Sequence, residues 1–154
     1  MQLLCKVEDR EIWLEELQRP FEFFDPFSGE KFVCILLVND FTITAKEQEA
    51  ICDKIIAYNC QFAVCTGIDC FSWHDSIDRA FIANNENFFL SDERFIMTSC
   101  HEEESLSEVI YFALNYTNYN SHQFKKYLIL MVGKNDEILE EITKATLLRT
   151  ALTR

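Results

Sequence analysis

The sequence predicts an α/β protein. We expect a three-layer sandwich in which a mainly parallel sheet of about four strands carries helices on both faces, with a short helix before it at the N-terminus. Three observations predict this fold class. Apolar runs alternate with amphipathic segments four times along the chain, a pattern typical of parallel sheets. The apolar runs are continuous, as in strands buried on both faces. Nearly half of the 154 residues are apolar, enough for one sizeable core.

The N-terminal part precedes this repeat. In residues 8–18, Ile12, Trp13 and Leu17 recur at helical spacing, so we predict a short helix that ends at Arg19-Pro20. Residues 21–32 are aromatic and rich in turn formers, which predicts a connector. The whole chain, residues 1–154, is expected to form a single domain with its core at about 32–148.

Four strand and helix units follow. Strands are predicted at 32–38, 61–66, 94–99 and 126–132, and helices at 44–59, 72–86, 105–118 and 135–152. Thr44 with Glu47, and Ser105 with Glu108, have the spacing of capping boxes at helix starts. Asn135 can cap the last helix. Right-handed crossovers place helices on both faces of the sheet if the winding reverses direction.

The charge balance restricts the classes of partner. The chain has 14 basic and 26 acidic residues, a formal net charge of −12. Such a surface is repelled by nucleic-acid phosphates and by anionic membranes. A basic protein would be attracted and its association accelerated. The alternative is that the acidity serves only solubility.

The seven cysteines indicate a reducing compartment. Their number is odd, the N-terminus lacks the apolar core of a signal peptide, and no apolar run approaches the roughly 20 residues of a membrane span. We therefore expect a cytoplasmic protein with reduced thiols. Cys34, Cys52 and Cys65 lie in apolar patterns and are expected in the core. No cofactor is expected.

Polar residues follow each predicted strand, where sites collect in parallel sheets. The first turn, Asn39 to Thr42, has no glycine, which disfavours a phosphate-binding loop. A receiver-like magnesium site could use Asp40, Asp69, Thr98 and Lys134. However, only four core strands are predicted, and the stretch after Asp69 does not resemble the acceptor loop of such domains.

Metal binding and nucleophilic catalysis are two further alternatives. Cys70, His74, Cys100 and His101 are residue types that bind Zn²⁺, but Cys100 and His101 are adjacent and no C-x2-C pair exists. A cysteine nucleophile would pair Cys70 or Cys100 with a histidine. The three glutamates after His101 should raise the pKa of the Cys100 thiol, which weighs against a reactive thiolate.

Two stretches resemble a small uncharacterised bacterial family. Its first block reads G-x-[DE]-C-x-x-W-[DH]-D-x-x-D, and its second is a strand ending in T-x-W-H-x-[DE]-E before a helix. The matching residues here are Gly67, Asp69, Cys70, Trp73, Asp75 and Asp78, then Thr98, His101, Glu103, Glu104, Val109 and Phe112. Cys100 stands in place of the tryptophan. The resemblance covers about residues 32–132. It implies a signature on two adjacent loops at one sheet edge, and it brings no established activity.

The resulting expectation is an acidic cytoplasmic binding protein, specifically an immunity protein that neutralises a basic protein toxin. Trp73 would be the aromatic anchor of the partner surface. The expected partner-binding residues are Asp69, Trp73, Asp75, Asp78, His101, Glu102, Glu103 and Glu104. Structural alternatives are that Trp73 only packs in the core, that Asp75 and Asp78 only favour the start of their helix, and that the three glutamates only favour the helix start beside them.

The alternative function is a small enzyme or a ligand-binding domain at the same edge. Its members would be Cys70, Asp75, His101 and Glu103, with His101 as general base and Glu103 or Asp75 orienting it. In either case the loops after the second and third predicted strands should lie side by side.

Overall fold

The computed structural model describes residues 1–85, 95–119 and 122–152, with the backbone alone for 148–152. Its centre is a six-stranded sheet in the order β1-β2-β6-β3-β4-β5. The strands are β1 (Gln2–Val7), β2 (Arg10–Leu17), β3 (Phe32–Val38), β4 (Cys60–Gly67), β5 (Met97–His101) and β6 (Lys126–Val132). All neighbouring strands are parallel except β1, which is antiparallel to β2. The α/β fold with a mostly parallel sheet is therefore confirmed.

The predicted N-terminal helix is wrong. Residues 8–18 contain the turn after β1 and strand β2, which pairs with β1 on one side and β6 on the other. Ile12 and Leu14 are buried on one face of the sheet, and Trp13 between them packs on the other. This alternation is the period of a strand. The hairpin raises the number of strands from about four to six.

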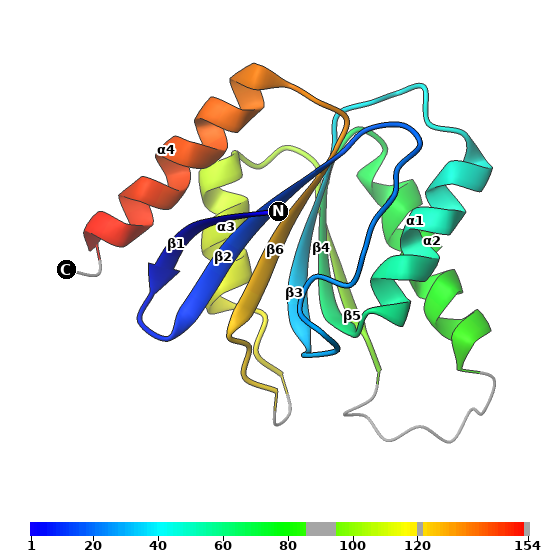
Figure 1. Ribbon diagram of the computed structural model, residues 1–154, viewed down its shortest axis with the longest axis horizontal. Coiled ribbons are helices and arrows are strands. Elements are labelled where there is room, and N and C mark those ends of the chain that lie inside the picture. The colour runs from blue at the N-terminus through cyan, green and yellow to red at the C-terminus, as the bar shows by residue number, and fades with distance from the viewer. Residues whose placement is uncertain (86–94, 120–121, 153–154) are drawn as a thin grey trace.

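The helices form two layers. They are α1 (Ala45–Ala57), α2 (Cys70–Asn84), α3 (Leu106–Asn115) and α4 (Asp136–Leu152). Figure 1 shows α1 and α2 on one side of the sheet and α3 and α4 on the other. The predicted helix positions are confirmed to within a few residues. The predicted end of the second helix, at residue 86, and the predicted start of the third strand, at residue 94, lie outside the described residues.

The core has one half on each face of the sheet. Along β3 every residue is buried. Cys34 and Leu36 pack with α1 and α2, whereas Val33 and Ile35 pack with α3. A strand that faces helices on both sides has no polar face, and this accounts for the continuous apolar runs.

The helix starts follow the predicted capping chemistry. Thr44 with Glu47 and Ser105 with Glu108 form complete capping boxes on α1 and α3. Asn135 Oδ1 accepts a 3.1 Å hydrogen bond from the backbone N–H of Ile138 at the start of α4. These side chains satisfy backbone donors that the first helical turn leaves unpaired.

The helices carry no membrane span. Within the described ranges, none combines the length and the apolar character that crossing a bilayer requires.

Candidate functional site: an acidic edge at the strand ends

The carboxyl ends of the parallel strands lie along one edge of the sheet, the upper one in Figure 1. From β3 the chain winds outward through β4 to β5, then returns to β6 on the other side of β3. Winding therefore reverses between β3 and β6, the place where open α/β sheets commonly bind ligands.

The loops after β4 and β5 lie side by side, as predicted. The two strands are paired up to Thr66 and His101. The buried Thr66 hydroxyl also donates a 2.9 Å hydrogen bond to the carbonyl oxygen of His101. Asp69 and the glutamates after His101 therefore extend from neighbouring strand ends.

An open depression of about 420 Å³ lies at this edge. All four loops after β3, β4, β5 and β6 contribute to it. Its lining includes the polar or charged side chains of Asn39, Thr66, Glu102, Glu104, Ser105, Asn135 and Glu141. Three of these side chains are carboxylates, so the depression is suited to a cationic group.

Exposed carboxylates follow β4 and β5 at this end of the sheet. Asp69, Glu102, Glu103 and Glu104 are all exposed, and Asp75 on α2 has a side chain that is 66% exposed. Within the described residues, none of these five forms an ion pair with a lysine or arginine. Glu104 and Asp75 each contact a histidine ring nitrogen, so the charges most open to a partner are those of Asp69, Glu102 and Glu103.

The opposite end of the strands has a different charge pattern. Lys125 and Lys126 mark the start of β6, and Lys6 lies near the start of β2. Lys126 and Lys6 pair with Glu11, and Lys125 pairs with Asp9. Acidic and basic side chains therefore pair with each other at this end, whereas Asp69, Glu102 and Glu103 have no such basic partner among the described residues.

Apolar side chains are exposed at the same edge. Phe41, in the loop after β3, is 83% exposed. Phe71, in the first turn of α2, is 58% exposed, and Ile68 after β4 is 37% exposed. Exposed aromatic residues among charged ones are typical of protein-binding surfaces. We call the surface formed by Phe41, Ile68, Asp69, Phe71, Asp75, Glu102, Glu103 and Glu104 the acidic edge.

The expected aromatic anchor, Trp73, is not on this surface. It is only 2% exposed and packs in the core beneath α2. Trp73, Ile77 and Ala80 share the helix face that covers the sheet, and Phe71 and Asp75 lie on the outer face. The sequence does indicate that Trp73 is buried, because Trp73, Ile77 and Ala80 have the spacing of a buried helical stripe.

His101 is also largely buried, at 6% exposure. Its Nδ1 lies 2.8 Å from Oε2 of Glu104, and its Nε2 lies 2.9 Å from Oγ of Ser99. The ring packs on Phe112, with centroids 4.5 Å apart. The carboxylate beside His101 is therefore Glu104, and not Glu103 or Asp75 as expected from the sequence.

A second polar network lies on the other face of β5. His74 Nε2 is 2.9 Å from Oγ1 of Thr98, which donates a 3.1 Å hydrogen bond to Asp78. Nδ1 of His74 is 3.3 Å from Asp75. Asp78, expected on the partner surface, instead ties α2 to β5. Of the receiver-like set, Thr98 is thus bonded to His74 and Asp78, and Asp40 accepts a hydrogen bond from the hydroxyl of Thr42.

Residues 13–148 match the family described as domain of unknown function DUF7684. The chain belongs to this family. The resemblance to an uncharacterised domain family is thereby confirmed, and the match extends beyond the two sequence blocks to β2, most of α4 and everything between. No curated protein and no solved structure matches the chain.

In this member of the DUF7684 family, the metal-ligand residue types do not converge. Across residues 1–85, 95–119 and 122–152, no group of three or more His, Cys, Asp or Glu side chains is arranged to hold a metal ion.

The side chains of Cys70 and Cys100 contact each other, with their Sγ atoms 2.9 Å apart. Burial, the contact with Cys70 and the charge of Glu102 together raise the pKa of the Cys100 thiol to about 12.

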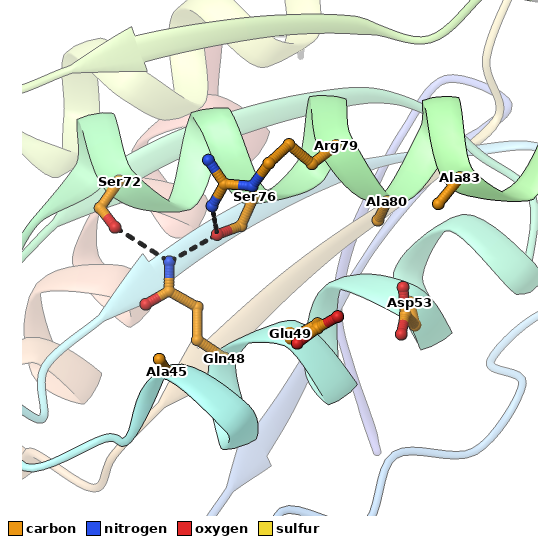
Figure 2. Close-up of a pocket in the computed structure, with 9 residues that line it drawn as sticks. All are labelled: Ala45, Gln48, Glu49, Asp53, Ser72, Ser76, Arg79, Ala80 and Ala83. Carbon is orange, nitrogen blue, oxygen red and sulfur yellow. Dashed lines mark hydrogen bonds between the residues drawn. The ribbon is translucent and has the colours of Figure 1, made fainter.

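A second hollow, of about 340 Å³, lies between α1 and α2. Figure 2 shows Gln48 reaching from α1 toward α2, where its Nε2 donates to Oγ of Ser72 at 3.1 Å and to Oγ of Ser76 at 2.8 Å. Arg79 also donates to Ser76, at 3.1 Å. The hydrogen bonds from Gln48 join the two helices across this hollow, and its polar groups are already bonded to one another.

Proposed function

We propose that this DUF7684 protein is a binding protein that recognises a basic protein through the acidic edge. The observation that carries the proposal is the coincidence of exposed Phe41 and Phe71 with the exposed carboxylates that follow β4 and β5. The aromatic side chains supply apolar contact area, and the carboxylates supply attraction and orientation.

A basic toxin domain fits this surface best. A protein that neutralises a toxin by covering its active site needs charge and shape complementarity and no catalytic residues of its own. The chain has a net charge of −12, and exposed carboxylates accompany the exposed apolar side chains at the acidic edge. An immunity function in the cytoplasm follows from this reading, with Phe71 replacing Trp73 as the aromatic anchor.

Affinity capture with matched variants tests the proposal. The natural chain, Phe71→Ala and the control Phe24→Ala are immobilised and exposed to extract from the source organism. Phe24 is 73% exposed and lies in the connector before β3. A basic protein should be retained by the natural chain and by Phe24→Ala, should elute with salt, and should be lost or strongly reduced with Phe71→Ala. Equal retention by all three chains would contradict the proposal.

A second candidate function, acyl transfer or ester hydrolysis, is favoured by one observation. Ser99, His101 and Glu104 are connected in the order hydroxyl, imidazole, carboxylate, at 2.9 Å and 2.8 Å. This is the arrangement by which a base activates a nucleophile and a carboxylate orients the base. The 6% exposure of His101 leaves little of the ring accessible to a substrate, which is why we place this function second.

Hydrolysis of p-nitrophenyl acetate by the pure protein tests this candidate. Turnover that is abolished by both Ser99→Ala and His101→Ala, in variants that retain the natural unfolding midpoint, would establish it. Hydrolysis no faster than that by the two variants would exclude it.

A further inference from the structure

We infer that Cys70 and Cys100 form an oxidisable dithiol site, which a small-molecule disulfide such as glutathione disulfide converts into an intramolecular disulfide. Cys70 opens helix α2, directly after the loop that leaves β4. Cys100 is the penultimate residue of β5. The proposed function does not use this pair of cysteines.

The positions of the two sulfur atoms carry the inference. Their separation of 2.9 Å is already short for a contact between two thiols. A disulfide requires about 2.05 Å, so the bond needs a shift of less than about 1 Å. Two elements that pack against each other, α2 and β5, hold the side chains, and the Thr98, His74 and Asp78 network fixes the same two elements one turn further along α2.

Accessibility sets the order of the steps. Cys100 is partly exposed and Cys70 is 2% exposed. The thiolate of Cys100 attacks one sulfur of glutathione disulfide, the sulfur–sulfur bond of the oxidant breaks, and one glutathione thiolate leaves. Cys70 then loses its proton to solvent and attacks Cys100 Sγ, and the second glutathione thiolate leaves. The two protein thiols are oxidised by two electrons, and the oxidant is reduced to two thiols.

The other cysteines make good internal controls. Cys34, Cys52, Cys60 and Cys65 are buried inside the core. Burial raises the pKa of Cys52 and of Cys60 to about 12. Cys5, on β1, is the other partly exposed cysteine. It tests whether exposure alone is enough for oxidation.

The test is prolonged oxidation of the folded natural chain with excess glutathione disulfide in alkaline buffer, since the raised pKa of Cys100 keeps its thiolate fraction small and the first step slow. We expect two of the seven thiols to disappear, the mass to fall by two hydrogens, and peptide mapping to join Cys70 to Cys100. The unfolding midpoint should rise and return to its starting value with reductant, because the cross-link restricts the unfolded chain. Cys5→Ser should behave like the natural chain.

Two variants separate a disulfide from simple exposure. Cys70→Ser should accumulate one bound glutathione on Cys100, since the second step is blocked. Cys100→Ser should not form the internal bond. If the natural chain retains seven thiols after prolonged exposure, if it also stops at a glutathione adduct on Cys100, or if the cross-link maps to another pair, the inference is wrong.

Discussion

The hydroxyl of Thr66 donates a 2.9 Å hydrogen bond to the carbonyl oxygen of His101, at the point where β4 and β5 end. This bond joins the two loops that carry Asp69 and the glutamates 102–104. The acidic edge therefore rests on paired strand ends, and its side chains extend from a fixed backbone.

Thr66→Val tests this support. The substitution keeps the shape of the buried side chain and removes its donor, so the free energy of unfolding should fall by about 1–2 kcal/mol. Thr66→Ser retains the hydroxyl and should lose less. Chemical denaturation of the three chains measures the difference, and equal stability of Thr66→Val and the natural chain would show that the bond contributes nothing.

Gly67 is required for the close approach of the loops that follow β3 and β4. Its φ of +89° is left-handed, and a Cβ at this position would collide with the carbonyl oxygen of Val38. Gly29 has a similar φ of +86°, but a Cβ there meets nothing within 4 Å. Gly29→Ala should cost about 1–2 kcal/mol from backbone strain alone. Gly67→Ala should cost more than about 3 kcal/mol. Similar unfolding midpoints for the two variants would contradict this account.

Ser105 caps α3 immediately after the acidic loop. Its Oγ accepts a 3.2 Å hydrogen bond from the backbone N–H of Glu108. Ser105→Ala should reduce the free energy of unfolding by about 1 kcal/mol, and Ser105→Asp should retain most of it, since aspartate is an equally good cap. A loss as large in Ser105→Asp as in Ser105→Ala would assign the effect to something other than capping.

Acid should weaken the loop after β3. The side-chain hydroxyl and then the backbone N–H of Thr42 hold the pKa of Asp40 below its usual value of 3.8. A carboxyl group with a lowered pKa in the folded state stabilises the fold above its unfolded pKa. That contribution is lost as the pH falls below about 3.8 through the folded pKa. Thr42→Val should raise the pKa of Asp40 in a carboxyl NMR titration, and Thr42→Ser should leave it low. An unchanged titration in Thr42→Val would exclude the hydroxyl as the cause.

The sequence predicted the fold where local pattern and tertiary environment agree. Strands β3, β4 and β6 are almost entirely apolar because both faces are covered, and the capping boxes are local chemistry. It failed at β2, where the spacing of Ile12, Trp13 and Leu17 also fits a helix. Pairing with β1 and β6 overrides that preference. No local signal at β2 reveals a strand partner more than 100 residues away.

The sequence predicted which edge of the sheet carries the candidate site, but not which side chains are exposed there or which of them contact one another. Parallel topology alone brings the loops after β4 and β5 together. Which side of α2 faces the sheet decides that Trp73 is buried and Phe71 exposed, and the apolar stripe through Trp73 and Ile77 indicates this. Contacts such as Ser99 with His101, or Cys70 with Cys100, depend on the exact register of packed elements, which spacing along the chain does not determine.

Whether the acidic edge binds the partner is tested most directly by reversing the same number of charges at this edge and, in a control, at the opposite end of the strands. Asp75, Glu102 and Glu103 are changed to lysine in one chain. Glu8, Asp9 and Glu30, which lie near the amino ends of β2 and β3, are changed to lysine in a control chain with the same net charge. All six side chains are exposed, so both chains should unfold near the natural midpoint.

The association rate constant of the purified captured basic protein is then measured for each chain as salt is increased. We expect the natural and control chains to associate fast at low salt and to slow steeply as salt rises, because opposite charges steer the encounter. The Asp75, Glu102 and Glu103 variant should associate at least about tenfold more slowly at low salt, with little salt dependence. Equal rates and equal salt dependence for the two lysine variants would contradict the claim that this edge binds the partner.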